Sequence, residues 1–228
     1  MILENNSLHV HEVNLSTTDQ ANISAAFAVL TTEEQEKAER SVHEKNRRRF
    51  VLARSTLRHL LGDYLNKSPS QIDLQYSPTG KPHLCNDLFF NISHSADTAV
   101  MGFCRDREVG IDMECLDSRK CFDGTIQRYF TEEEKEALLS EKDEEARRAL
   151  FLKYWTFKEA YVKATGKGLA ELEQATYAIP FFEREFSFED NDGRHWDASI
   201  HQMPRYVVSI VTERNWELGQ HAVKTRFR

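Results

Sequence analysis

The sequence predicts an α+β protein built from two similar halves, each of which has helices followed by strands. Residues 47–65 show the apolar periodicity of a helix, and short apolar runs typical of strands follow before residue 114. A second succession of helical and strand patterns begins after that residue. We therefore expect two halves, residues 1–114 and 115–228, related by a pseudo-twofold duplication, with one active site at their interface.

Composition and charge narrow the class of protein. The chain has 228 residues, of which 40% are hydrophobic, with 30 basic and 37 acidic side chains and a net charge of −7. This proportion of hydrophobic and charged residues excludes global disorder. The negative net charge argues against nucleic acid as a partner. The apolar runs fall short of the ~18 residues of a membrane span, and the first residues lack the layout of a signal peptide. We expect a cytoplasmic protein with no membrane partner.

The first half is expected to begin with helices. The run Thr-Thr-Glu-Glu at residues 31–34 is typical of a helix start and predicts a helix over residues 31–41. Leucine and tyrosine side chains then recur at helical spacing over residues 47–65. Residues 37–58 contain eight Lys or Arg side chains against two Glu. This imbalance indicates a local anion-binding site on an acidic protein.

Strand patterns fill the rest of the first half. Residues 72–76 alternate like a strand, and residues 88–92 form a short apolar run. Residues 98–104 and 109–114 are two further runs, joined by the charged residues 105–108. Two runs joined by four polar residues predict that these two strands form a hairpin.

The second half repeats the order of helices and strands. Thr131 and Glu134 have the spacing of a capping box, although a role for Glu134 near the site is an equal alternative. A long helix is predicted from about residue 145 to a stop at Gly166. The tail is predicted to form strands at residues 177–179, 185–188 and 206–211, with a turn at residues 191–193.

Acidic side chains on one strand are the first candidates for chemistry. Asp112 and Glu114 lie two residues apart, so on a strand they project from the same face. Two carboxylates held side by side repel, and one takes up a proton unless a cation lies between them. A pair of solvated surface acids is the alternative.

The predicted long helix carries a third carboxylate. Glu159 and Lys163 are one turn apart, which is also the spacing of a simple exposed ion pair. They stand among aromatic residues, where charges are usually committed to a partner. If Glu159 converges with Asp112 and Glu114, the oxygen ligands suit Mg²⁺ shared with substrate phosphates, and Lys163 lies near the same phosphates.

Seven short motifs follow one another in the sequence in an order found in a known family. The sequence resembles the 4′-phosphopantetheinyl transferases, specifically the longer surfactin-synthetase-activating type. The matching motifs are the Arg-rich residues 48–58, Gly80-Lys81-Pro82, Phe90-Asn-Ile-Ser-His-Ser95, Val109-Gly-Ile-Asp-Met-Glu114, Phe130-Thr-Glu-Glu-Glu134, residues 155–163 and Gly166-Lys-Gly-Leu169. They span residues 47–169 in the family's order, and Met113 stands where the family commonly has Ile or Val.

The resemblance implies an activity. Such enzymes are expected to transfer the 4′-phosphopantetheine group of coenzyme A to a serine of an apo acyl or peptidyl carrier protein, releasing adenosine 3′,5′-bisphosphate. It implies Mg²⁺, with Mn²⁺ as an alternative, on Asp112, Glu114 and Glu159. Glu159 and Lys163 become the expected catalytic residues, with Glu159 as the proton acceptor for the carrier serine. The duplication within one chain favours a monomer.

The resemblance also implies positions for the phosphates of coenzyme A. Its pyrophosphate and its separate monophosphate require cations at two places. The implied contacts to the pyrophosphate and nearby phosphates are Lys158, Lys163 and His94, and those to the 3′-phosphate and adenosine are Arg49, Lys81, Lys37 and Ser93. Residues 116–130, including Phe122, Ile126 and Tyr129, are a candidate carrier-docking surface or else part of the core.

Two other functions are consistent with the same residues. A metal-dependent phosphodiesterase would use the three carboxylates with water as the nucleophile. A protein that binds coenzyme A or a carrier without turnover is the non-enzymatic alternative, and the retained carboxylates and Lys163 argue against it. The Gly-Lys pairs at residues 80–81 and 166–167 lack the surrounding pattern of a phosphate-binding loop, so nucleoside triphosphatases of that class are excluded.

Overall fold

The structure is a computed structural model that describes most of the chain. The described residues are 1–5, 7–117, 123–168, 171–172, 184–214 and 224–227. None of the helices in these ranges has the length and apolarity that crossing a membrane requires.

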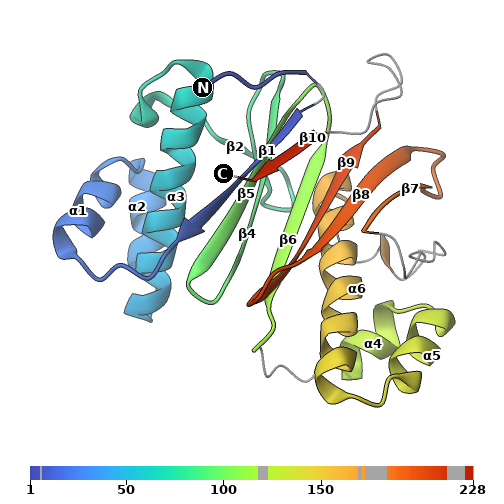
Figure 1. The fold of residues 1–228 in the computed structure, drawn as a ribbon. Coiled ribbons are helices and arrows are strands. Elements are labelled where there is room, and N and C mark those ends of the chain that lie inside the picture. The colour runs from blue at the N-terminus through green and yellow to red at the C-terminus, as the bar shows by residue number, and fades with distance from the viewer. Residues whose placement is uncertain (6, 118–122, 169–170, 173–183, 215–223, 228) are drawn as a thin grey trace.

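The first half contains both helices and strands (Figure 1). Its elements are β1 (Ser7–Asn14), α1 (Gln20–Ala28), α2 (Thr32–Glu39), α3 (Glu44–Leu65), a 3-10 turn (Pro69–Gln71), β2 (Gln75–Tyr76), β3 (Pro82–His83), β4 (Leu88–Ser95) and β5 (Thr98–Arg105). The predicted helices over residues 31–41 and 47–65 are confirmed as α2 and α3. The strand predicted over residues 72–76 is shorter and is confined to β2.

The second half follows the same order, with one strand returning to the first half. Its elements are β6 (Val109–Cys115), α4 (Asp123–Tyr129), α5 (Glu132–Ser140), α6 (Glu144–Thr165), β7 (Glu185–Glu189), β8 (His195–Gln202), β9 (Tyr206–Glu213) and β10 (Lys224–Phe227). The helix predicted from residue 145 is confirmed as α6, and two of the predicted tail strands as β7 and β9. The strand predicted at residues 177–179 lies outside the described residues.

The two halves repeat one arrangement. In the first sheet, β1 pairs antiparallel with β5, and β5 pairs antiparallel with β4. In the second sheet, β6 pairs antiparallel with β9, and β9 pairs antiparallel with β8. The long helices α3 and α6 both have 22 residues and begin at Glu44 and Glu144. The predicted duplication of an α+β unit is confirmed.

The pairing of the strands corrects two expectations. The predicted hairpin between residues 98–104 and 109–114 is wrong, because β5 and β6 belong to different sheets. The hairpin forms instead between β4 and β5, where Ser95 pairs with Thr98 and Ala96 adopts a positive φ of 52°. Because β6 belongs to the second sheet, we propose a division between the halves at residues 106–108 in place of the division after residue 114.

Each long helix covers one sheet. Figure 1 shows α3 and α6 on opposite outer sides of the paired sheets. Leu57 and Leu61 of α3 pack in the core of the first half, and Phe157 and Tyr161 of α6 in the core of the second. A further apolar cluster, which includes Val10, lies between the two sheets. This burial of apolar surface is the main source of the fold's stability.

Both halves anchor the long helix through a buried glutamate. Thr31 and Glu34 form a capping box at the start of α2, and Thr131 and Glu134 form one at the start of α5. Each glutamate also forms an ion pair with the neighbouring long helix. The pairs are Glu34 with Arg58, at 2.7 Å, and Glu134 with Lys158, at 3.0 Å. The capping interpretation of Glu134 is therefore confirmed, and the same carboxylate ties α5 to α6.

The Glu134–Lys158 ion pair is fully enclosed. Lys158 has no solvent exposure, and its ammonium lies 5.6 Å from the centre of the Phe130 ring. Burial raises the pKa of Glu134, and the ammonium opposes this effect. The two charged groups are within ion-pair distance, but their geometry falls outside that of a hydrogen bond. The pair therefore stabilises the fold only as long as both charges are present.

Replacement of Lys158 by methionine should destabilise the protein by about 3–5 kcal/mol, because Glu134 would keep a buried carboxylate without its cation. Urea denaturation measures the loss, and the double variant Lys158→Met/Glu134→Gln should recover most of it. The control is Lys135→Met, which removes an ion pair to the 81% exposed Glu132 and should cost less than about 1 kcal/mol. Equal effects of the two methionine variants would contradict this prediction.

The first half holds a polar network between its first strand and its long helix. The hydroxyl of Tyr64 on α3 lies 2.8 Å from Nδ1 of His9 and 2.8 Å from Nε2 of His11, both on β1. A tyrosine hydroxyl can donate to one imidazole and accept from the other, so the network satisfies these polar groups. The corresponding place in the second half, between β6 and α6, holds charged side chains.

Candidate active site at the junction of the halves

Side chains of β4 join the two sheets. Strands β4 and β6 are edge strands of different sheets, and the alternate polar residues of β4 accept hydrogen bonds from the backbone of β6. The bonds run from the amides of Ile111, Met113 and Cys115 to Asn91 Oδ1 (3.0 Å), Ser93 Oγ (3.2 Å) and Ser95 Oγ (3.0 Å) respectively. The period of two along β4 places all three polar side chains on the same edge. This contact fixes the position of β6 against the first half.

The two serines also orient the acidic side chains of β6. Ser93 Oγ donates to Asp112 Oδ1 at 2.7 Å, and Ser95 Oγ donates to Glu114 Oε2 at 3.0 Å. Each hydroxyl therefore accepts from a backbone amide and donates to a carboxylate, which uses both of its hydrogen-bonding capacities. The serines of the Phe90–Ser95 motif thus position two of the predicted ligand residues.

The predicted carboxylates line one small cavity. It has a volume of about 270 Å³, and its walls include Asp112 and Glu114 from β6 and Glu159 and Lys163 from α6. His94 of β4 lines the same cavity. The convergence expected from the sequence, of two carboxylates from a strand with one from a distant helix, is therefore present in the structure.

Asp112 is the most deeply placed of the three acids. Its side chain is buried, and Lys163 Nζ lies 2.6 Å from its Oδ1 atom. Burial raises the pKa of Asp112 above its ordinary range, while the charge of Lys163 and hydrogen bonds from Lys163 and Ser93 oppose this rise. The second carboxylate oxygen, Oδ2, is buried without a hydrogen-bond partner. A buried carboxylate oxygen without a hydrogen-bond partner is stabilised when a further cation binds to it.

These residues suit a magnesium ion in their chemistry. The cavity presents carboxylate oxygens from Asp112, Glu114 and Glu159, and oxygen ligands are those that Mg²⁺ prefers. The unpartnered Oδ2 atom of Asp112 offers one such ligand directly. Within the described part of the chain, no three His, Cys, Asp or Glu side chains stand close enough together to enclose an ion. Mg²⁺ keeps several waters and is usually held by one or two carboxylates together with substrate phosphates, so water and substrate would complete its coordination here.

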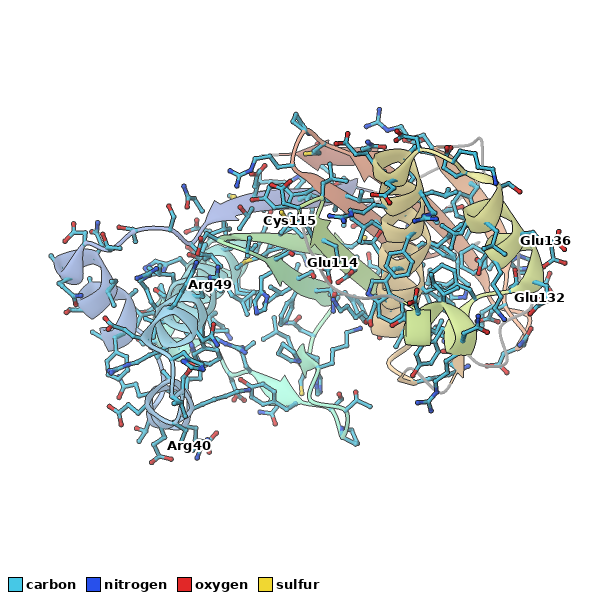
Figure 2. The ribbon with its side chains drawn as sticks, turned by 90° about the horizontal axis from the view of Figure 1, so that it is seen from below. Arg40, Arg49, Glu114, Cys115, Glu132 and Glu136 are labelled. Carbon is cyan, nitrogen blue, oxygen red and sulfur yellow. The ribbon has the colours of Figure 1, made fainter. Side chains whose placement is uncertain are left out.

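A larger cavity adjoins the first. It has a volume of about 750 Å³ and shares His94 and Glu114 with the smaller one. The first half contributes Arg49 of α3, and the second contributes Arg205 of the turn between β8 and β9. Figure 2 labels Arg49 on helix α3 of the first half and Glu114 on strand β6 of the second. The remaining lining residues are Asn46, Phe50, Ser95, Ala96, Cys115 and Asp117.

Asp97 holds the predicted binding residue Arg49 in place. Its Oδ1 atom accepts a hydrogen bond from Arg49 Nε at 2.8 Å, and its Oδ2 atom lies 3.4 Å from Lys45 Nζ. The two charges lower the pKa of Asp97, so the carboxylate stays ionised. The bond occupies Arg49 Nε and leaves the two terminal nitrogens, which form the fork that binds phosphate.

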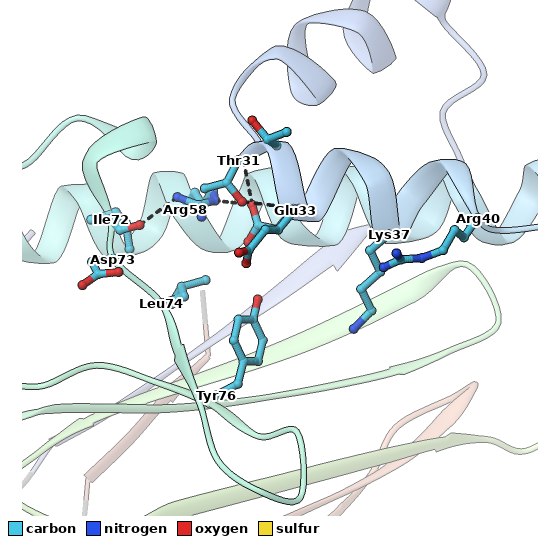
Figure 3. Close-up of a pocket in the computed structure, with 11 residues that line it drawn as sticks. Thr31, Glu33, Lys37, Arg40, Arg58, Ile72, Asp73, Leu74 and Tyr76 are labelled. Atoms are coloured by element: carbon cyan, nitrogen blue, oxygen red, sulfur yellow. Dashed lines mark hydrogen bonds and ion pairs between the residues drawn. The ribbon is translucent and has the colours of Figure 1, made fainter.

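Three other predicted binding residues lie apart from these two cavities. The expectation that Lys158 contacts the pyrophosphate is corrected, because its side chain is fully buried against Glu134. Lys81 forms an ion pair with Glu108 at 3.0 Å. Lys37 lines a third cavity, of about 520 Å³. Figure 3 shows this cavity, with Lys37 of α2 and Tyr76 of β2 among the side chains that line it. The ion pair between Glu34 and Arg58 also lines it.

The suggested carrier-docking residues lie within the second half's core or outside the described range. Ile126 and Tyr129 are partly buried against the α6 core, where Tyr129 contacts Trp155 at 6.0 Å between ring centres. Phe122 is not among the described residues. The core interpretation of residues 116–130 is therefore the better one for Ile126 and Tyr129.

The sequence motifs do not include two residues at the larger cavity. These are Arg205, which lines it, and Asp97, which binds Arg49. Asp97 lies in the turn between β4 and β5, whereas the sequence predicts the hairpin one strand later. Aspartate is also a common turn residue, so its presence there does not indicate a binding role. Arg205 follows Pro204 in a turn, far along the chain from every matched motif. Its role depends on the packing of the second half against the first, which no local pattern reports.

Two duplicated α+β halves thus enclose adjoining cavities, one lined by three carboxylates and a lysine, the other by two arginines. This is the arrangement of an enzyme that acts on a phosphorylated substrate. Sequence comparison shows its family. The profile of the 4′-phosphopantetheinyl transferase superfamily matches residues 108–217, and the N-terminal profile of 4′-phosphopantetheinyl transferases matches residues 16–104.

Individual relatives agree with these profiles. The chain is 35% identical to the 4′-phosphopantetheinyl transferase HetI of a Nostoc species over 184 residues, which cover 78% of this chain and 77% of HetI. It is 32% identical over 171 residues to the L-aminoadipate-semialdehyde dehydrogenase-phosphopantetheinyl transferase of Homo sapiens, covering 68% of this chain and 54% of that protein. It is 35% identical over 147 residues to the transferase psf-1 of Bacillus pumilus, covering 58% and 61%. The chain belongs to the 4′-phosphopantetheinyl transferases, which confirms the resemblance seen in the motifs.

Proposed function

We propose that this protein transfers the 4′-phosphopantetheine group of coenzyme A to a serine of an apo acyl or peptidyl carrier protein, in a reaction that requires Mg²⁺. The observation that carries the proposal is the pair of adjoining cavities. The smaller one offers Lys163 and three carboxylates, and the larger one offers Arg49. Coenzyme A has a pyrophosphate and a separate 3′-phosphate, so it needs cationic groups at two such places.

In this proposal, Asp112, Glu114 and Glu159 hold the Mg²⁺ ion, with Mn²⁺ as an alternative. When bound, such an ion neutralises developing charge on phosphate oxygens. The chain's own cation at the same place is Lys163, whose ammonium already lies in the cavity. His94 lines both cavities, so it can contact phosphate oxygens on either side.

The proposed reaction replaces the phosphoanhydride bond of coenzyme A by a phosphodiester bond to the carrier serine. The hydroxyl oxygen of the carrier serine forms a bond to the phosphorus that bears pantetheine. The bond from this phosphorus to the bridging oxygen breaks, and adenosine 3′,5′-bisphosphate leaves with that oxygen. Glu159, which faces the cavity from α6, accepts the serine proton directly or through water. Lys163 stabilises the charge that develops on the bridging oxygen as it leaves with adenosine 3′,5′-bisphosphate.

Both halves needed for the proposed site are present in one chain, and the monomeric state stays a prediction from the sequence. Both halves contribute, with Ser93 and His94 from the first and the three carboxylates from the second. The cytoplasmic location stays a prediction from the sequence.

Mass spectrometry of a carrier protein tests the proposal. With apo carrier, coenzyme A and Mg²⁺, we expect the carrier to gain the mass of one phosphopantetheine group, and we expect chelation of the metal to prevent the gain. A serine-to-alanine carrier is the control for the site of attachment. If several apo carriers gain no mass, the proposal is wrong. Hydrolysis of coenzyme A without any carrier would favour the phosphodiesterase alternative.

A further inference from the structure

We propose that Arg205 is a binding residue for the 3′-phosphate of coenzyme A and acts together with Arg49 from the opposite half. The inference rests on the proposed function, because it assigns one part of that substrate to one cavity. It adds a residue of the second half that lies outside every motif matched in the sequence. The larger cavity would then hold a phosphate between two arginines that belong to different halves.

The backbone at Arg205 is fixed in the structure. The carbonyl of Arg205 accepts a hydrogen bond from the Leu116 amide at 2.9 Å, just beyond the end of β6. The next residue, Tyr206, begins β9, and its hydroxyl lies 2.6 Å from Thr98 Oγ1 in the first half. The turn that carries Arg205 is therefore tied both to β6 and to the hairpin that carries Asp97. Its position relative to the first half is defined by these contacts.

The side chain of Arg205 is available to a ligand. The residue is exposed, and its guanidinium lies 5.8 Å from the centre of the Tyr206 ring. Among the described residues, Arg205 forms no ion pair with an acidic side chain, although Glu114 and Asp117 line the same cavity. A guanidinium that stacks on an aromatic ring keeps its nitrogen donors directed outward. These donors match the oxygens of a phosphate.

The position of the cavity selects the 3′-phosphate over the pyrophosphate. Lys163 and the buried Asp112 line the smaller cavity and not the larger one, so we place the pyrophosphate and its metal ion there. Arg49 and Arg205 line the larger cavity and not the smaller one. A monophosphate carries about two negative charges at neutral pH. Because Arg49 is already paired with Asp97, and Glu114 and Asp117 line the same cavity, binding such a group calls for the further positive charge of Arg205. His94 and Glu114 mark the boundary across which the nucleotide would pass.

Steady-state kinetics with two substrates tests this assignment. Arg205→Gln should raise KM for coenzyme A about tenfold, as expected for loss of one hydrogen-bonded charge contact, with kcat within about twofold. With dephospho-coenzyme A, which lacks the 3′-phosphate, the variant and the unchanged protein should have KM values within about twofold. Arg49→Gln should show the same dependence on the 3′-phosphate.

A matched substitution controls for the change of charge. Arg147→Gln removes an exposed arginine of α6 that lines neither cavity, and it should leave both KM values unchanged. An equal KM for coenzyme A in Arg205→Gln and the unchanged protein would overturn the inference. An increase in the KM of Arg205→Gln that is equally large with dephospho-coenzyme A would also overturn it. So would an increase in KM for the carrier protein with no change in KM for coenzyme A. Failure of the unchanged protein to modify any carrier would instead reject the proposed function.

Discussion

Replacement of Asp112 by asparagine should reduce phosphopantetheine transfer about a hundred- to a thousandfold, the range found on loss of one preorganised electrostatic group in other enzymes. Asp112 contributes the buried carboxylate to which Lys163 and Ser93 bind, and its Oδ2 atom is the unpartnered oxygen of the cavity. Asparagine has nearly the same shape but removes the negative charge. The rate of carrier modification at saturating coenzyme A and Mg²⁺ measures the effect.

The folded state should tolerate this substitution. Burial already opposes the charged form of Asp112, so a neutral amide removes an unfavourable burial as well as a favourable ion pair. We expect an unfolding temperature close to that of the unchanged protein. Asp87→Asn is the control, because Asp87 is a largely exposed acid paired with Arg105 away from the cavities, and it should retain full activity. Full activity of Asp112→Asn would show that the metal assignment is wrong.

Replacement of Gly110 by alanine should prevent stable folding of the second half. A Cβ atom at Gly110 would lie 1.9 Å from the carbonyl oxygen of Ala160 and 2.5 Å from the amide nitrogen of Ala164. Both are backbone atoms of α6, so the collision is relieved only by moving the helix away from β6. Overpacking against side chains costs about 1–3 kcal/mol, and a backbone collision exceeds that range. We expect insoluble protein or a fall in unfolding temperature of about 10 °C or more.

A second strand glycine provides the matched control. A Cβ atom at Gly102 on β5 would meet only the side chains of Ile111, Leu8 and Val109, at 3.7–3.8 Å. These are ordinary van der Waals contacts, so Gly102→Ala should change the unfolding free energy by less than about 1 kcal/mol. Thermal unfolding followed by circular dichroism compares the two variants. Similar unfolding temperatures would contradict the close approach of α6 to β6.

Local patterns in the sequence were sufficient for the long helices but not for the pairing of strands. Helix α3 was recognised because its apolar residues recur with the helical period, which depends on the segment itself. The partner of β5 depends on which distant strands reach it, and both β1 and β4 do. Strands β1 and β8 were missed, although Leu8 and Val10 of β1 alternate with polar residues as a strand requires.

The candidate site was predictable where residue type and spacing carry the signal. The carboxylates of Asp112, Glu114 and Glu159 were expected together and line one cavity. Lys158 shares the motif of Glu159, but at 3.6 residues per turn it projects from another face of α6 and is buried against Glu134 of α5. Arg205 belongs to none of the matched motifs. It lines the same cavity as Arg49 because the two halves pack together, which no local sequence pattern reports.

The internal repeat has a consequence for the number of active centres. Two identical copies related by a twofold axis must present the same surface twice, so a symmetric dimer of one half would carry every site in duplicate. Joining the copies in a single polypeptide removes that obligation. Here β1 and α3 enclose histidines with a tyrosine, whereas β6 and α6 enclose acids with a lysine. The two halves are thereby free to differ, and each supplies different groups to one shared site, Arg49, Ser93 and His94 from the first and the three carboxylates with Lys163 from the second.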